Sequence, residues 1–198
     1  MHSVTESATS RQVKRLRTER RISRCAQQLT QERGLDGFTM DELAERAEVS
    51  RRTLFNYFPS KNDAVLGPVP PLSEEACGVF VAGGPTGHLI DDLSALADEI
   101  LDAHDVDRED VELAKRVIIG EPRLLPIAHE RFETVLGQLT DLILEREGDR
   151  ITPTEARLLI RLLVTIFECA MTQFVAGDDR PVDELFDENL RTARTLLA

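Results

Sequence analysis

The stretch "TMDELAERAEVSRRTLFNYFPSK", residues 39–61, predicts two short helices joined by a tight turn. Thr39 followed by Glu42 forms a capping box, in which each side chain bonds the backbone amide of the other residue, so a helix begins after Thr39. Ser50 is a favourable N-cap and opens the next helix. That helix ends near Pro59, because proline disfavours helical geometry in the residue before it.

The second of these helices has two chemically different faces. Leu54 and Phe58 lie four residues apart and form an apolar inner face. Arg52, Phe55 and Asn56 then point outward. Two short helices of this kind are typical of a helix-turn-helix, whose outer face enters a groove of DNA. The alternative is a plain helical hairpin with a solvated basic face.

The outward side chains have the chemistry expected of contacts with DNA. Arg52 can donate two hydrogen bonds to a guanine edge or hold a phosphate, and Phe55 can pack on a thymine methyl group. Tyr57 and Lys61 lie where they would reach phosphates on either side. The stretch is therefore a candidate nucleic-acid interface.

A longer helix is predicted ahead of this pair, over residues 11–33. Four apolar residues recur at the spacing of one helical face, namely Ile22, Cys25, Ala26 and Leu29. Gly34 follows as a carboxy-terminal cap. Its exposed faces carry cations that form either a solvated surface or a row of phosphate contacts, namely Arg11, Lys14, Arg15, Arg17, Arg20, Arg21 and Arg24. Residues 1–10 are small and polar, and we expect a flexible tail there.

Positive charge is confined to the first third of the chain. A capping box of Ser60 and Asp63 starts one more helix, which ends near Leu66. Residues 1–66 hold 12 Lys+Arg and 9 Asp+Glu, whereas residues 67–198 hold 12 and 27, although the whole chain has a net charge of -12. A basic segment on an acidic body indicates that only this segment meets a polyanion.

The composition is that of an ordinary globular protein, and 198 residues suffice for one or two domains. No stretch approaches the roughly 18 uninterrupted apolar residues of a membrane span, and the first ten residues lack the pattern of a secretory signal. We therefore expect a cytoplasmic protein that does not contact a membrane. Cys25, Cys77 and Cys169 form no CxxC motif, and we expect buried thiols.

The rest of the chain, residues 67–198, is predicted to be a helical bundle. Residues 67–87 are rich in proline and glycine and form a hinge or loop with at most a short helix. Helices follow at about 88–104, 110–119, 124–147, 154–176 and 182–197. Their short connections, marked by glycine or proline, favour antiparallel packing. We expect a ligand pocket between the helices of about 88–176, with a small hydrophobic or amphipathic ligand.

The segment of residues 158–174 is apolar on nearly all sides, with one narrow polar stripe. Such a helix needs covering on most sides, which predicts a place between the core of its own subunit and a partner subunit. We expect a homodimer whose interface includes Ile166, Phe186 and Leu190. The alternative is that these residues belong to a monomeric core.

No motif points to catalysis or to a cofactor. The four histidines form no HExxH, and no GxSxG is present. The acidic stretch of residues 102–112 includes His104, but such a run is more often a solvated turn than a metal site. We expect neither an enzyme nor a metal protein. An all-helical enzyme or carrier with an incidental basic hairpin is the alternative function.

The stretch "TMDELAERAEVSRRTLFNYFPSKNDAV", together with the helix before it, resembles the DNA-binding domain of the TetR (tetracycline-repressor) family of transcriptional regulators. The resemblance covers about residues 11–66. It implies an all-α fold with an amino-terminal three-helix DNA-binding domain and a carboxy-terminal helical domain for ligand binding and dimerisation. It also implies a repressor that leaves a palindromic operator in double-stranded DNA when a small molecule binds.

The resemblance also implies which residues face DNA. These are Thr39, Arg51, Arg52, Thr53, Phe55, Asn56, Tyr57 and Lys61. The chain departs from the family pattern at Glu48, in the turn between the two short helices, where the family usually has glycine. Glycine tolerates a positive φ far more readily than glutamate does.

Overall fold

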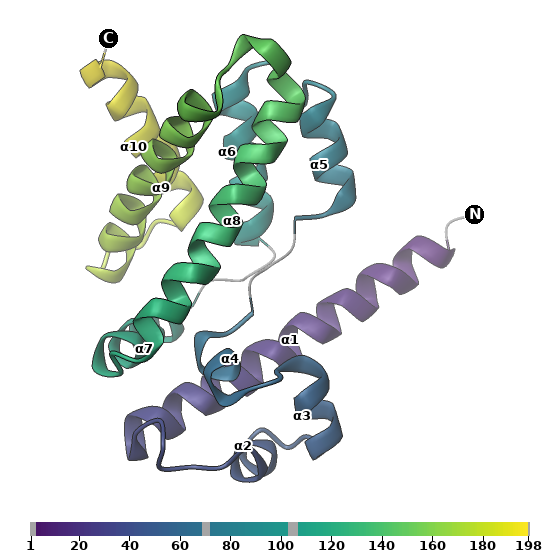
Figure 1. Ribbon diagram of the computed structural model, residues 1–198, viewed down its shortest axis with the longest axis vertical. Helices are drawn as coiled ribbons and strands as arrows, with labels where there is room; N and C mark the ends of the chain where they lie inside the picture. The colour runs from purple at the N-terminus through teal and green to yellow at the C-terminus, as the bar shows by residue number, and fades with distance from the viewer. Residues whose placement is uncertain (1–2, 69–71, 103–106, 198) are drawn as a thin grey trace. The chain divides into compact units, whose positions relative to one another are not determined.

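The computed structural model describes residues 3–68, 72–102 and 107–197, and every regular element in them is helical (Figure 1). In chain order the elements are α1 (Ser3–Arg33), α2 (Met40–Arg46), α3 (Arg51–Tyr57), α4 (Lys61–Leu66), α5 (Glu74–Val81), α6 (Leu89–Asp102), α7 (Arg108–Gly120), α8 (Leu124–Glu147), a 3-10 turn at Gly148–Arg150, α9 (Pro153–Val175) and α10 (Val182–Leu197). The chain forms two compact units. Unit 1 comprises Met1–Val69 with Glu109–Ala128, and unit 2 comprises Pro70–Arg108 with His129–Ala198.

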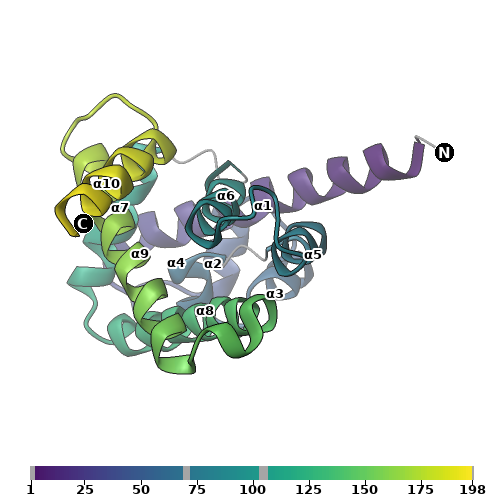
Figure 2. The ribbon, with the colours of Figure 1, turned by 90° about the horizontal axis from the view of Figure 1, so that it is seen from above.

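The helix α1 is longer than the sequence predicted. It begins at Ser3 instead of near Arg11, so residues 3–10 are helical rather than a coil. These residues lack an apolar face, which is why hydrophobic periodicity gave no sign of a helix there. The amino-terminal part of α1 extends past α2, α3 and α4 in both views (Figures 1 and 2).

The core of unit 1 is formed where α2, α3 and α4 pack on the carboxy-terminal half of α1. Ile22, Ala26 and Leu29 of α1 are almost fully buried, as the sequence predicted. Leu43 of α2 and Leu54 of α3 are also completely buried in the same cluster. Ala44 of α2 and Ala47, which caps it, are buried too, and the predicted inner face of α3 is confirmed by the burial of Leu54 and Phe58.

The side chain of Lys61 braces unit 1. Its ammonium group donates hydrogen bonds to the carbonyl oxygens of Leu35, at 2.8 Å, and of Phe38. The same nitrogen lies 4.5 Å from the centre of the Phe38 ring. Lys61 thereby ties the start of α4 to the connection between α1 and α2.

The α7–α8 connection holds the same α1–α2 segment from another direction. A carboxylate oxygen of Glu121 accepts a hydrogen bond from the backbone amide of Leu35 at 2.9 Å. Arg123 forms an ion pair of 2.9 Å with Asp36. These contacts explain why residues 109–128, distant in sequence, belong to unit 1. From the sequence we assigned them to the separate segment of residues 67–198, because the spacing of apolar residues does not show that a later segment packs back on an earlier one.

Unit 2 is a bundle with two apolar clusters. One cluster joins α5, α6, α8 and α9 around Phe80, Leu96 and Ile143. The other joins α9 to α10, and in it Phe167 and Phe186 make an edge-to-face contact with ring centres 6.4 Å apart. The helices predicted at 124–147 and 182–197 have these bounds, and α5 lies within the predicted loop of 67–87. His104 lies outside the described residues.

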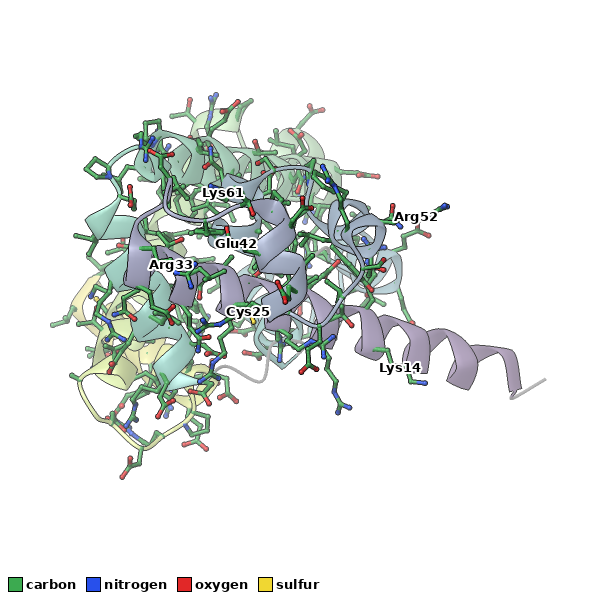
Figure 3. All side chains as sticks on the ribbon, turned by 90° about the horizontal axis from the view of Figure 1, so that it is seen from below. Lys14, Cys25, Arg33, Glu42, Arg52 and Lys61 are labelled. Carbon is green, nitrogen blue, oxygen red and sulfur yellow. The ribbon has the colours of Figure 1, made fainter. Side chains whose placement is uncertain are left out.

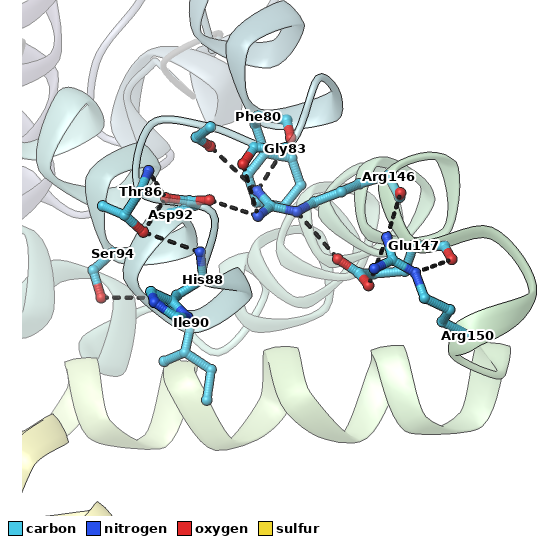
Figure 4. Close-up of polar contacts among 11 residues, drawn as sticks. Phe80, Gly83, Thr86, His88, Ile90, Asp92, Ser94, Arg146, Glu147 and Arg150 are labelled. Atoms are coloured by element: carbon cyan, nitrogen blue, oxygen red, sulfur yellow. Dashed lines mark hydrogen bonds and ion pairs between the residues drawn. The ribbon is translucent and has the colours of Figure 1, made fainter.

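A buried ion pair lies at the centre of unit 2 (Figure 4). Arg146 donates to Asp92 at 2.5 Å, and both side chains are almost completely buried. The same guanidinium bonds the carbonyl oxygens of Phe80 at 3.1 Å and Gly84 at 3.2 Å. Burial opposes ionisation of Asp92, but hydrogen bonds from Thr86 and the charge of Arg146 outweigh it and lower the pKa of that carboxyl. One arginine therefore joins α8 to α6 and to the end of α5.

The helix α9 exposes much of its apolar surface. By length and composition it is apolar enough to cross a membrane, with a mean hydropathy of 1.8 over its most apolar window, of which 17 % is buried. Leu158 and Leu162 are 59 % and 46 % exposed. Cys169, predicted to be buried, is exposed on this helix, whereas Cys25 and Cys77 are half-buried. Exposed apolar surface of this kind is typical of an interaction site.

Replacing Lys61 with methionine keeps most of the side-chain volume and removes the ammonium group. We expect K61M to lower the free energy of unfolding by about 1–3 kcal/mol, because the Leu35 and Phe38 carbonyls lose a charged donor. Urea denaturation followed by circular dichroism measures the change. K115M removes an exposed lysine of α7 and is the matched control, with an expected change below about 0.5 kcal/mol. Equal effects of the two changes would contradict the bracing role of Lys61.

The buried pair of unit 2 predicts that D92N is far more harmful than D91N. The first change leaves the buried Arg146 with Glu147, at 3.1 Å, as its remaining carboxylate partner and should cost about 3 kcal/mol. The second breaks only the exposed pair of Asp91 with Arg194 and should cost less than about 1 kcal/mol. Because the pKa of Asp92 is lowered, its stabilisation is complete above the ordinary carboxyl pKa and is lost as pH falls through the folded value. Urea titrations at pH 7 and pH 3 should therefore show a smaller gap between wild type and D92N at pH 3.

Candidate nucleic-acid interface

The capping box that begins α2 fixes the first helix of the helix-turn-helix. The amide of Glu42 donates to the Thr39 hydroxyl at 3.2 Å, and the Thr39 amide donates to the Glu42 carboxylate at 2.7 Å. The backbone and hydroxyl hydrogen bonds from Thr39 keep the pKa of Glu42 below its ordinary value. The box is therefore intact at neutral pH and weakens on acidification.

The turn between α2 and α3 keeps a left-handed residue without using glycine. Glu48 has a φ of 51°, and it is the one described residue other than glycine with a positive φ. Its amide donates to the Glu45 carbonyl at 3.0 Å, and the amide of Val49 donates to Ala44 at 2.9 Å. A left-handed conformation costs a non-glycine residue about 1–2 kcal/mol. The residues on either side of the turn, Ala44, Ala47 and Leu54, are buried in one apolar cluster, and such packing can offset a cost of this size.

The outer face of α3 is open to solvent. Arg52, Phe55 and Asn56 are exposed, as the sequence predicted, and Figure 3 shows Arg52 pointing away from the core of unit 1. Arg52 has no ion pair with any residue that the structure describes. Since a phosphate or a base edge does not have to displace a carboxylate first, Arg52 is free to bind either of them.

Arg51, the neighbour of Arg52, is already engaged within the protein. Its guanidinium donates to Asp41 of α2 at 3.1 Å and lies 5.6 Å from the centre of the Phe55 ring. This cross-turn contact holds the Phe55 ring and links α3 to α2. Sequence reasoning missed it, although an acidic residue ten positions earlier on α2 was the available signal.

Four other residues expected to face DNA also make contacts within the protein. Thr39 is the cap of α2, and the hydroxyl of Thr53 lies 2.7 Å from that of Ser50, which caps α3. Tyr57 is half-buried, with the Arg15 guanidinium 5.9 Å from its ring centre. Lys61 is half-buried and engaged with two carbonyls. The structure therefore brings all eight residues to one region, but it leaves only some of them unengaged.

Ser60 caps α4, as the sequence predicted. The Ser60 hydroxyl accepts from the Asp63 amide at 3.2 Å, which is the expected N-cap bond. The same hydroxyl donates to the Asp63 carboxylate at 2.5 Å, so the two side chains meet at the start of the helix.

Two of the three residues predicted for the dimer interface lie inside their own subunit. Phe186 and Leu190 of α10 are only 2 % and 7 % exposed and fill the cluster between α9 and α10. Ile166 of α9 is half-buried beside them. The large apolar side chains that α9 and α10 expose are those of Leu158, Leu162, Leu196 and Leu197, which the sequence pattern did not separate from the core.

Two open cavities of the size that small ligands occupy lie among the described residues of unit 2. One of about 360 Å³ lies between α5 and α6, with an apolar lining that includes Val79, Phe80 and Leu96. The other, of about 350 Å³, lies between α8 and α9, and the ion pair of Arg161 with Glu133 is at its edge. Among the described residues, no group of histidine, cysteine, aspartate and glutamate side chains is arranged to hold a metal ion.

Comparisons with known proteins point to one family. Residues 22–66, from the middle of α1 to the end of α4, match the family described as "Bacterial regulatory proteins, tetR family". The HTH-type transcriptional regulator TcmR of Streptomyces glaucescens is 28 % identical over 144 residues, which cover 70 % of this chain and 64 % of TcmR. The match thus spans less than two thirds of that relative.

A solved structure shares the fold as well. The crystal structure of a protein from Mesorhizobium loti, assigned to the TetR family, superposes with a TM-score of 0.52 at 20 % identity and covers 92 % of this chain and 96 % of that one. The segment that matches the family contains the helix-turn-helix described above. The solved structure shares the all-helical fold over most of the chain. Residues 22–66 therefore match the TetR family of bacterial regulatory proteins, and the chain as a whole is similar in sequence to TcmR and in fold to the Mesorhizobium loti protein.

Proposed function

We propose that this protein is a ligand-responsive transcriptional regulator that binds double-stranded DNA through α3 and represses the genes it controls. The observation that carries the proposal is the outer face of α3, where Arg52 stands exposed and without an ion pair among the described residues of an acidic protein. A cation left unneutralised on a short, well-braced helix suits a major groove.

Each exposed side chain of α3 has a natural counterpart in the groove. Arg52 donates two hydrogen bonds to a guanine edge, and Asn56 is suited to an adenine edge. Phe55, with 41 % of its surface exposed, packs on a thymine methyl group. Arg51 holds the Phe55 ring and turns to a phosphate only by leaving Asp41. Lys61 holds the α1–α2 connection through the carbonyl oxygens of Leu35 and Phe38, and we expect any contact with a phosphate to contribute less than this structural role.

A homodimer completes the proposed regulator. The exposed apolar stripe of α9, formed by Leu158 and Leu162, is suited to bury itself against the same stripe of a second copy. A two-fold axis would then present two α3 helices to a palindromic operator, one in each half-site. The polar residues of α9, such as Arg161 and Glu168, suit a protein interface better than a lipid one.

The cavity between α5 and α6 is the proposed effector site. Its apolar lining suits a small hydrophobic or amphipathic molecule, and Asp92 at its wall belongs to the buried pair with Arg146. An effector that binds there releases DNA only by binding the DNA-incompetent arrangement more tightly.

The role of Arg52 is tested by separating sequence preference from general affinity. We expect R52A to weaken binding to a duplex selected from a random DNA pool by about 1–3 kcal/mol per half-site, because a bidentate base contact is lost. Binding to a scrambled duplex should change less. K115A, which removes an exposed lysine of α7, should leave both isotherms unchanged. If R52A loses equal affinity for the two duplexes, Arg52 binds a phosphate instead of a base edge. If wild type shows no salt-dependent binding to DNA, the proposed function is wrong.

The dimer is tested by charging the exposed stripe of α9. L158E with L162E should convert the protein into a monomer, because two carboxylates would otherwise be buried without partners. Both residues are exposed in the subunit, so its helical content should be retained. I119E changes a residue of α7 that is 63 % exposed, and this control should leave the mass measured by analytical ultracentrifugation unaltered. A wild-type chain that sediments as a monomer at micromolar concentration would contradict the proposal.

A further inference from the structure

Asp41 is the residue of α2 whose side chain reaches the recognition helix α3. Its carboxylate accepts a hydrogen bond of 3.1 Å from the guanidinium of Arg51. The first turn of α3 holds no acidic residue of its own, so a carboxylate for Arg51 comes from another helix. The neighbouring carboxylate in α2, that of Glu42, is engaged by the Thr39 amide at 2.7 Å and by Arg33 at 3.3 Å. The first turn of α2 therefore offers α3 the side chain of Asp41.

The stability of unit 1 does not explain why Asp41 and Arg51 are paired. Their side chains are 61 % and 68 % exposed, and ion pairs between exposed side chains contribute little to the stability of a fold. The helices α2 and α3 are already joined by Leu43 and Leu54, which are completely buried in one apolar cluster. The pair lies instead on the surface that is proposed to meet DNA.

The pair also restrains the ring of Phe55. Arg51 and Phe55 lie four residues apart on one face of α3, and the guanidinium carbon is 5.6 Å from the centre of the ring. This distance is within the range of about 6 Å for a cation–π contact. Phe55 is 41 % exposed, and contact with a guanidinium that Asp41 holds in place restricts the rotamers of such a side chain. Carboxylate, guanidinium and ring thus act in series.

We infer that Asp41 is a positioning residue for DNA recognition, which keeps Arg51 on the Phe55 ring and away from the phosphates. The inference rests on the proposed function and assigns a source of its sequence preference. Phosphate contacts strengthen binding to every sequence, whereas the contact of Phe55 with a thymine methyl group depends on the sequence. The Asp41 carboxylate also repels phosphates. Asp41 therefore weakens binding to DNA in general and favours sequences that place a thymine at Phe55.

The first test measures how binding to a scrambled duplex depends on salt. D41N keeps the size of the side chain and removes its charge, so Arg51 becomes available to a phosphate. We expect D41N to bind the scrambled duplex more tightly than wild type does, with a slope of log affinity against log salt that is steeper by about 0.9 per subunit. Between 50 and 200 mM salt, D41N should then lose about 3.5-fold more affinity per subunit than wild type.

D36N is the matched control for this charge removal. It takes the same charge from an exposed ion pair of the same unit, in which Asp36 lies 2.9 Å from Arg123. Arg123 keeps Glu121 as a partner at 3.6 Å, so no arginine is released. The salt slope of D36N should equal that of wild type. D41E retains a carboxylate for Arg51 and should also resemble wild type.

The thymine methyl group provides a second readout. In a duplex selected from a random DNA pool, each thymine is replaced in turn by deoxyuridine, which lacks only this methyl group. One replacement in each half-site should weaken binding of wild type about fourfold, the effect of one buried methyl group, and F55A should abolish the loss at that position. D41N should reduce the loss at the same position, whereas D36N and D41E should retain it.

A double-mutant cycle tests whether Asp41 acts through Arg51. In the R51Q background there is no arginine to release, so D41N should leave the salt slope unchanged. A steeper slope of D41N/R51Q than of R51Q would contradict the inference. Circular dichroism verifies that every variant keeps its helical content.

The outcomes separate this inference from the proposed function. If wild type binds the selected duplex, but D41N matches D36N in salt slope and in the effect of deoxyuridine, the inference is wrong and the function stands. The inference is also wrong if wild type shows no methyl effect that F55A removes. If D41N weakens binding to both duplexes equally and loses helical content, Asp41 has only a structural role, and the inference is wrong. If wild type binds no DNA, the proposed function itself has failed.

Discussion

The helices α2 and α3 have seven residues each and would not be stable alone in water, so they depend on packing within unit 1. The first turn of any helix costs more conformational entropy than its few hydrogen bonds return, so α2 and α3 exist only through packing. Their buried residues Leu43 and Leu54 meet the stripe of α1 that includes Ile22. Caps at Thr39 and Ser50 satisfy the free amides at each start. Everything presented by the outer face of α3 therefore depends on the inner face of the same short helix.

The acidic composition of the chain limits the number of basic side chains that remain without an acidic partner. With 36 acidic and 24 basic residues, most arginines find a carboxylate within reach, and the fold decides which of them do. Arg51 and Arg52 are adjacent in sequence, yet one is engaged with Asp41 and the other is unpaired among the described residues. Local charge counts thus overstate the surface available to a polyanion, because a neutralised arginine must first give up its partner.

Most of the fold was predictable from the sequence because its signals are local. Hydrophobic periodicity located α1, and the caps at Thr39, Ser50 and Gly34 all lie where the sequence placed them. The prediction of an all-helical chain is confirmed for the described residues.

Features that depend on distant parts of the chain were not predictable. The start of α1 at Ser3 carries no apolar pattern, and the membership of residues 109–128 in unit 1 rests on contacts such as Glu121 with Leu35. Apolar spacing identified the face of α10 that bears Phe186, but it does not reveal whether a buried face meets its own subunit or another. The resemblance implied the candidate DNA-facing residues, whereas their engagement within the protein depends on contacts, such as Arg51 with Asp41, that the sequence does not reveal.

The left-handed glutamate of the turn has an evolutionary consequence. A glutamate codon becomes a glycine codon by one base change, so a relaxed turn has always been one mutation away from this sequence. Because backbone hydrogen bonds at Glu48 and Val49 already define the turn, the identity of the side chain there is uncoupled from the angle between α2 and α3. Since 85 % of the Glu48 side chain is exposed, with its carboxylate 4.0 Å from Arg21, a change of charge there alters this surface contact and leaves the backbone hydrogen bonds of the turn in place.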